Sequence, residues 1–133
     1  MIWSRVLYGS ETWTMTKEDI KRLGAFELWI WRRILRISWI EHRTNEDVLR
    51  LVEEKPTLMN MIRTRQKTRI GHTLRGDSLL RIVLEGRMKG KKVPGRPRAM
   101  LLSWMMNKER KYKDLKEKAS NRLEWYRWTP DPV

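Results

Sequence analysis

The chain contains no cysteine, and this absence excludes several classes of function. A protein without thiols has no disulfides, no cysteine-ligated zinc and no thiol chemistry, and it is compatible with a reducing compartment. The only histidines are His42 and His72, and no His-rich spacing surrounds them. The sequence therefore predicts no metal site and no cofactor.

Clustered carboxylates are also missing. Two-metal nucleotidyl transfer needs several acidic side chains around the ions, but the aspartates are far apart in this sequence. The doublet of two glutamates, Glu53-Glu54, is interpreted as solvated surface because adjacent residues on a helix diverge. No glycine-rich loop of the P-loop type is present either. The sequence predicts no catalytic residue, so the chain is not expected to be an enzyme by itself.

Long apolar runs are absent as well. No stretch approaches the ~18 residues needed to span a membrane, and the N-terminus lacks the apolar stretch of a signal peptide. No predicted helix pairs a clean apolar face with a clean basic one, so no membrane partner is expected. The 133 residues suggest one domain or a piece of a larger one, with a modest core to which eight Trp and eight Met contribute.

What the sequence has in excess is positive charge, and this charge is concentrated in the middle third. Residues 60–98 hold twelve Lys or Arg against two acids, which is +10 of the formal +14. Such a concentrated field attracts polyanions and holds them by releasing counterions, so RNA or DNA is the expected partner. The alternative is a solvated basic surface with no dedicated ligand.

The pattern of apolar and capping residues predicts an all-α fold of five to six helices. Thr16 with Asp19, and Thr44 with Asp47, have the spacing of capping boxes and mark two helix starts. Further helices are predicted from Thr57 to about Leu74, from Asp77 or Ser78 to Leu84, from about Ala99 to Lys111, and from Leu115 to Trp128.

One face of the first predicted helix combines arginine with an aromatic residue. Trp29 projects together with Arg22, Arg33 and Arg36, and Arg32 lies nearby. In one interpretation an exposed Trp29 stacks on a base while the arginines hold phosphate. In the other, Trp29 packs against another helix, because large aromatic side chains are usually buried, and the arginines are solvated.

Two further basic segments follow. In the helix predicted after Thr57, bases alternate with other residues at Arg63, Arg65, Lys67 and Arg69, and such a segment cannot bury both of its sides cheaply. It is expected to lie between phosphate backbones or to stand exposed. The Gly- and Pro-rich segment after Glu85 contains Lys89, Lys91, Lys92, Arg96 and Arg98, and it predicts a mobile basic loop.

Within that loop, Gly95-Arg96-Pro97 resembles the AT-hook, an extended segment that lies in the minor groove of A·T-rich DNA. The tripeptide is short, and Pro94 stands where the motif usually has a base. The alternative is a generic basic loop in which the glycines and prolines only set the backbone shape. Phosphate binding is expected under both interpretations.

Seven short motifs follow one another in an order that resembles a known family. They are Leu7-Tyr8-Gly9-Ser10-Glu11-Thr12-Trp13, Leu23-Gly24-Ala25-Phe26-Glu27-Leu28-Trp29, Arg32-Arg33-Ile34-Leu35-Arg36-Ile37-Ser38-Trp39, Gly71-His72-Thr73-Leu74-Arg75, Val83-Leu84-Glu85-Gly86-Arg87, Gly95-Arg96-Pro97-Arg98 and Asn121-Arg122-Leu123-Glu124-Trp125. Each is weak alone, but in this fixed order they are similar to LINE-type (non-LTR) retrotransposon reverse transcriptases over nearly the whole chain. Gly24, Ile30 and the Lys-rich segment after Trp104 depart from the family's pattern.

The resemblance implies a position after the palm, in the thumb and C-terminal extension of a parent polyprotein. The family's endonuclease domain and palm aspartates lie upstream of these motifs, which agrees with the missing acidic cluster, and the start at Met1 suggests a truncated or domesticated copy. The expected segments are a thumb-like helical region (1–75), a short helix with a basic Gly/Pro-rich loop (76–98) and a C-terminal helical extension (99–133). The palm domain is a further expected partner, and the nucleus is the expected location.

The sequence therefore predicts a non-catalytic nucleic-acid-binding fragment that holds template RNA or primer–template duplex. The residues expected to contact it are Trp29, Arg32, Arg33, Arg36, Arg63, Arg65, Lys67, Arg69, Lys89, Lys91, Lys92, Arg96 and Arg98. Contacts of this kind go mostly to phosphate and carry no sequence information. The alternatives are an AT-hook-like minor-groove DNA binder and a relic open reading frame without selected function.

Overall fold

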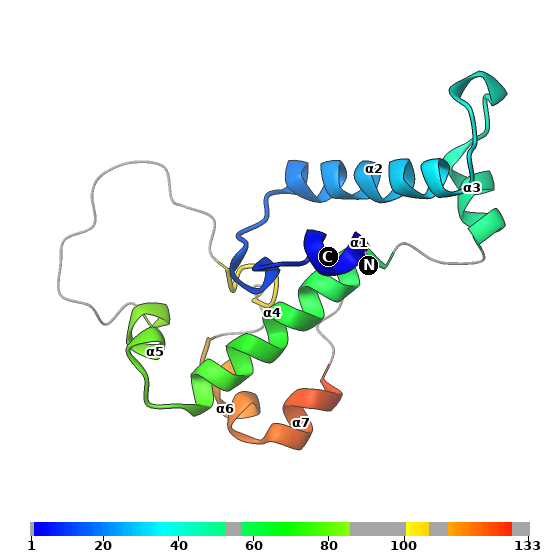
Figure 1. The fold of residues 1–133 in the computed structure, drawn as a ribbon. Helices are drawn as coiled ribbons and strands as arrows, with labels where there is room; N and C mark the ends of the chain where they lie inside the picture. Colours follow the sequence, from blue (N-terminus) through cyan, green and yellow to red (C-terminus); the bar gives the residue numbers. More distant parts are fainter. Residues whose placement is uncertain (1, 53–56, 86–100, 107–111, 129–133) are drawn as a thin grey trace. The chain divides into compact units, whose positions relative to one another are not determined.

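The structure is a computed structural model that describes residues 2–52, 57–85, 101–106 and 112–128. All regular structure in these ranges is helical (Figure 1), which confirms the predicted all-α class. The elements in chain order are α1 (Ile2–Val6), the 3-10 helix η1 (Ser10–Thr12), α2 (Lys17–Ile34), the 3-10 helix η2 (Trp39–Glu41), α3 (Asn45–Val52), α4 (Leu58–Arg75), α5 (Leu79–Leu84), α6 (Tyr112–Ser120) and α7 (Arg122–Arg127).

The two predicted capping boxes begin α2 and α3. The Thr16 N–H donates to Asp19 Oδ2 at 2.9 Å, and the Asp19 N–H donates back to Thr16 Oγ1 at 3.2 Å. Thr44 and Asp47 form the same pair of bonds at the start of α3, both at 3.2 Å. Each box satisfies backbone donors that have no partner inside the helix, which fixes where the helix starts.

The C-terminal helices differ from the prediction. The single helix expected from Leu115 to Trp128 is interrupted at Asn121, whose Oδ1 accepts from the N–H groups of Leu123 and Glu124 and caps α7. An asparagine that caps a new helix competes with continuation of the preceding one, because its side chain replaces the backbone acceptors. Residues 101–105, within the helix expected from Ala99 to Lys111, form turns instead. Seven α-helices are therefore present in the described ranges, against five to six predicted.

The chain divides into two compact units, and the division falls inside α4. Unit 1 comprises Met1–Tyr8 and Met15–Thr64, and unit 2 comprises Gly9–Thr14 and Arg65–Val133. The segments 1–75, 76–98 and 99–133, expected from the family resemblance, stay predictions.

Unit 1 contains a buried acidic side chain that ties two helices together. Glu27 of α2 is buried, and its Oε1 accepts from the Thr57 N–H at 2.8 Å and from the Leu58 N–H at 3.1 Å. These N–H groups lie at the start of α4, where a helix lacks internal acceptors. Glu27 therefore caps α4 from another helix, a role that its position in the sequence did not indicate.

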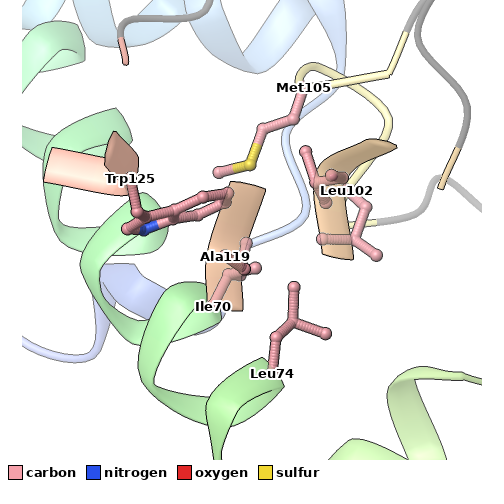
Figure 2. Packing of buried hydrophobic residues seen from close by; sticks show 7 residues of the cluster. Ile70, Leu74, Leu102, Met105, Ala119 and Trp125 are labelled. Atoms are coloured by element: carbon pink, nitrogen blue, oxygen red, sulfur yellow. The ribbon is translucent and has the colours of Figure 1, made fainter. Parts of the chain in front are cut away.

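The core of unit 2 gathers around Trp125. Figure 2 shows its indole beside Met105, Ile70 and Ala119, and the cluster of buried side chains also includes Leu74, Leu102 and Leu115. The indole Nε1 donates to the carbonyl of Lys67 at 3.0 Å, which satisfies its one polar atom. A Cβ at Gly71 would lie 2.6 Å from Cδ1 of Trp125, so only glycine allows α4 and the indole to approach this closely.

In the described part of the chain, no helix combines the length and the apolar character needed to cross a membrane. The longest helices, α2 and α4, each have 18 residues and carry many charged side chains.

Candidate nucleic-acid interface

The end of α2 in unit 1 closes with a Schellman motif. The Arg36 N–H donates to the Arg33 carbonyl at 3.3 Å, and the Ile37 N–H donates to the Arg32 carbonyl at 2.9 Å. Arg36 has a φ of 54°, the left-handed conformation that glycine usually adopts at this position. An arginine there carries a backbone cost that glycine would avoid, which makes its side chain a candidate for a role beyond ending the helix.

A second local motif follows immediately. The Ser38 N–H donates to Glu41 Oε1 at 3.1 Å, and the Ile40 N–H donates to Ser38 Oγ at 3.4 Å. These bonds cap η2 from both directions, as in a capping box. The backbone on both sides of Ile37 is therefore fixed by hydrogen bonds within a few residues.

Arg32 is held inside unit 1. Its side chain is buried, and its Nη2 donates to the Arg43 carbonyl at 2.7 Å and to Asn45 Oδ1 at 3.1 Å. These bonds connect the end of α2 to the start of α3. The structure thus gives Arg32 an internal role, whereas the sequence pattern predicted a contact with a phosphate backbone.

A hollow lies beside the end of α2. Its volume is about 270 Å³, and among the described residues no acidic side chain lines it. The lining residues are Trp29, Arg32, Arg33, Arg36, Ile37 and Ser38. The structure therefore brings together the four site residues predicted for the helix that begins after Thr16, which are Trp29, Arg32, Arg33 and Arg36.

Trp29 is exposed at the rim of this hollow. Its side chain is 45% accessible, which does not fit the interpretation that it is buried against another helix. The ring of Phe26 lies parallel to it within 17°, with centroids 6.0 Å apart. The Arg33 guanidinium carbon lies 5.7 Å from the Trp29 ring centroid, within cation–π range. A large aromatic surface and planar cations therefore share one exposed site.

Charge is separated along α2. The first turn carries Glu18 and Asp19, and the last turn carries Arg32 and Arg33. Both signs match the helix macrodipole, so Arg33 has a structural explanation as well as a functional one. The exposed aromatic pair has no such explanation, because the dipole does not act on uncharged rings.

The four bases predicted to contact nucleic acid on α4, which are Arg63, Arg65, Lys67 and Arg69, are divided between structural and exposed positions. Lys67 Nζ donates to the carbonyls of Tyr126, at 3.1 Å, and Trp128, and burial lowers its pKa from the ordinary value of 10.5. Arg65 and Arg69 are exposed on the part of α4 that belongs to unit 2, and Arg63 is half-buried in unit 1. Lys67 thus binds the end of α7, and the exposed members of the four are Arg65 and Arg69.

The remaining predicted site residues lie outside the described residues. These are Lys89, Lys91, Lys92, Arg96 and Arg98. The AT-hook-like tripeptide belongs to the same segment, so its interpretation stays a prediction.

Sequence reasoning missed three residues of the site. Phe26 precedes Trp29 by one helical turn, and that spacing was a sufficient signal for their contact. Ile37 and Ser38 line the hollow only because α2 ends at Ile34, two residues before the left-handed Arg36. No glycine marks this helix end, so the usual sequence signal was absent.

The described ranges contain no group of three or more His, Asp or Glu side chains that could hold a metal ion. The comparisons with known proteins are also negative: no protein-family model, no curated protein and no solved structure matches this chain. A function must therefore be argued from the chemistry of the residues themselves.

Proposed function

We propose that the chain is a non-catalytic nucleic-acid-binding segment that holds template RNA or primer–template duplex. The observation that carries the proposal is the end of α2, where Trp29, Arg33 and Arg36 surround a hollow. No acidic side chain in the described part of the chain lines this hollow. Arginine forks match phosphate geometry, and an exposed indole offers a surface for a base. A merely solvated basic surface does not require an exposed aromatic pair.

The distribution of charge supports the same partner. The formal charge of +14 on 133 residues favours polyanions over neutral ligands at long range. On α4, Arg65 and Arg69 add exposed bases within unit 2. Contacts of this type hold a backbone without reading its sequence.

We further propose that the segment derives from the post-palm part of a non-LTR retrotransposon reverse transcriptase. Support comes from the order of the seven motifs and from contacts between two of them. Gly71 of one motif lies against Trp125 of another, and the Lys67 carbonyl that accepts from this indole is 58 residues away in the sequence. The two motifs therefore pack against each other in unit 2.

The proposal is tested by binding to fluorescent single-stranded RNA, duplex DNA and RNA–DNA hybrid over a salt series. The logarithm of affinity is expected to fall by about 0.7 to 0.9 per neutralised phosphate for each logarithmic unit of salt. The double variant Arg33→Ala/Arg36→Ala is expected to lower this slope by roughly 1.4 to 1.8. Arg22→Ala is the matched control, because it removes a charge from the same helix where Arg22 pairs with Glu18 at 2.7 Å.

The outcomes separate the remaining alternatives. A strong preference for A·T-rich duplex, lost in Arg96→Ala, would replace this proposal with the minor-groove one. A folded protein that binds none of the three ligands would contradict both this proposal and the minor-groove alternative. A chain that shows no helix by circular dichroism and no binding would favour a relic without selected function.

A further inference from the structure

The proposed function leaves a choice between a single strand and a duplex, and the geometry at Trp29 bears on it. A duplex presents phosphates and groove edges, whereas its bases are stacked on one another and cannot reach an aromatic side chain. We propose, resting on the proposed function, that the hollow beside Trp29 is a stacking site for one unpaired nucleobase. Arg33 and Arg36 then hold the phosphates that flank this base.

The first argument is the shape of the aromatic surface. The rings of Phe26 and Trp29 are stacked, with planes within 17° and centroids 6.0 Å apart, so Phe26 supports the orientation of the exposed indole. Both side chains are more than one third accessible, at 37% and 45%. Every base has a π-face, so an exposed indole accepts any base without reading its sequence.

The second argument is what occupies the ring now. The Arg33 guanidinium, a planar cation, lies 5.7 Å from the Trp29 centroid. Guanidinium groups and bases both stack on indole, so Arg33 holds a position that a base can take. When a base enters, Arg33 leaves the ring and pairs with the adjacent phosphate, which exchanges a cation–π contact for a stronger charged hydrogen bond.

The third argument is size. The hollow measures about 270 Å³, below the roughly 300 to 1,000 Å³ of pockets that enclose drug-sized ligands. It therefore suits one flat group inserted from the side. A long strand would lie across it and place only one base inside.

The fourth argument is preorganisation. The Schellman bonds of Arg36 and Ile37 and the cap formed by Ser38 fix the backbone around the hollow. Arg32 anchors the same helix end to the Arg43 carbonyl at 2.7 Å. A site that is already ordered loses little conformational entropy when its ligand binds.

An acidic or phosphorylated peptide is the competing ligand for such arginines. It would use Arg33 and Arg36, but it has no need for the exposed rings of Phe26 and Trp29. Cation binding is disfavoured because the lining is positively charged. Among polyanions, the observations thus favour one that carries both phosphates and flat apolar rings.

The test compares two single-stranded oligonucleotides of about 12 nucleotides, within the ~4–16 that one binding fold covers. One strand is a normal RNA, and the other has the same backbone without bases. Trp29→Leu is expected to weaken binding of the normal strand by about 5- to 140-fold, which corresponds to the ~1–3 kcal/mol of one stacked base. Binding of the abasic strand is expected to be unchanged, because both strands keep their phosphates.

Two variants control the comparison. Trp29→Phe keeps a ring and is expected to recover most of the lost affinity. Tyr8→Leu removes another exposed aromatic residue of unit 1, one that does not line the hollow, and is expected to leave both strands unaffected. Circular dichroism of each variant confirms that the helices are intact.

A second readout follows the Trp29 ring itself in the wild-type chain. With 5-fluorotryptophan in all Trp positions, the resonance of Trp29 is assigned by its loss in Trp29→Phe. The normal strand is expected to shift this resonance, and the abasic strand is expected to shift it much less.

The outcomes distinguish this inference from the proposed function. If the wild-type chain binds neither strand and no RNA–DNA hybrid, the proposed function fails and the stacking site with it. If it binds the hybrid but neither strand, the proposed function stands and the stacking site is overturned. If it binds both strands equally and Trp29→Leu changes neither, the proposed function stands and the stacking site is overturned. A phosphopeptide that shifts the Trp29 resonance more than the normal strand would also overturn it.

Discussion

Trp29 and Trp125 are two tryptophans in opposite environments. Trp29 is 45% accessible and stands among arginines at the end of α2, whereas Trp125 is 3% accessible and lies in the core of unit 2. The contacts of Trp29 come from its own helix, one turn to either side. Trp125 also has a local contact, with the ring of Trp128 at a centroid distance of 5.2 Å, but its other contacts come from α4, α6 and residues 101–106 (Figure 2).

The two tryptophans differ in how completely their surroundings satisfy the side chain. The surroundings of Trp125 satisfy both parts of its side chain, because its rings are packed and its Nε1 donates to the Lys67 carbonyl at 3.0 Å. The surroundings of Trp29 leave much of the ring in water, where an apolar surface is unfavourable. The exposed Trp29 is the ring that the proposed stacking site uses, whereas Trp125 serves the fold.

The largest expected effect concerns Trp125. Trp125→Ala is expected to lower the free energy of unfolding by about 3–5 kcal/mol, because it leaves a cavity and removes a bond to α4. Trp29→Ala is expected to lower it by less than about 1 kcal/mol, since its ring is only partly buried. Urea unfolding followed by circular dichroism measures both. Equal losses of unfolding free energy for the two variants would show that Trp29 is as important for the fold as Trp125.

Gly71 provides a sharper version of this experiment. In the wild-type chain, Gly71→Ala is expected to destabilise unit 2 by about 1–3 kcal/mol, because the new Cβ would overlap the Trp125 indole. In the Trp125→Ala background the sign is expected to reverse, since alanine favours a helix over glycine by roughly 1 kcal/mol. A Gly71→Ala substitution that stabilises the wild-type chain would show that the two residues are not packed together.

The next effect concerns Glu27, which supports unit 1 through polar bonds. Glu27→Ala is expected to cost about 1–3 kcal/mol, because the N–H groups of Thr57 and Leu58 lose their acceptor. Glu27→Gln keeps an oxygen acceptor and is expected to cost less. Amide hydrogen exchange at Thr57 and Leu58 measures the cap directly. Exchange that is equally slow in all three proteins would contradict this role of Glu27.

The sequence predicted features whose signals lie within a few residues. The boxes of Thr16 and Thr44 were predicted correctly because both partners fall within one helical turn. The grouping of Trp29 with Arg33 and Arg36 came from helical spacing in the same way. Such predictions need no knowledge of how distant parts of the chain meet.

Features that depend on distant partners could not be predicted. Glu27 caps Thr57, which lies 30 residues further along the chain, and nothing near Glu27 indicates it. Arg32 has the same residue type and neighbourhood as Arg33, yet one is buried against the Arg43 carbonyl and the other lies over Trp29. Asn121 is different, because an asparagine before an acidic first turn is a local cap signal that was overlooked.

A smaller effect is expected at Arg36, where stability and binding are predicted to change in opposite directions. Arg36→Gly is expected to raise the free energy of unfolding by about 1 kcal/mol, because glycine adopts a φ of 54° without strain. The same change is expected to lower the salt slope of RNA binding by about 0.7. Arg36→Ala is the matched control, since it removes the charge and keeps the strained Cβ. A gain in stability for Arg36→Ala as large as that for Arg36→Gly would mean that charge repulsion, and not the backbone, is relieved.

The smallest expected effect concerns the capping box of α3 and its dependence on pH. The bonds from the Thr44 hydroxyl and N–H lower the pKa of Asp47 below its ordinary value of 3.8. A carboxyl with a lowered pKa in the folded state contributes stability above the unfolded value, and this contribution is lost as pH falls through the folded value. Asp47→Asn is therefore expected to be less stable than wild type at about pH 6 and to approach the stability of wild type at about pH 3, as thermal unfolding at both values would show.

Glu46→Gln is the control, because it removes the same charge one residue earlier in the same turn and so separates the capping box from the helix dipole. If Glu46→Gln reproduced the whole pH dependence, the helix dipole alone would account for it. The hydrogen bonds of the capping box in unit 1 would then contribute less to stability than the packing around Trp125 in unit 2.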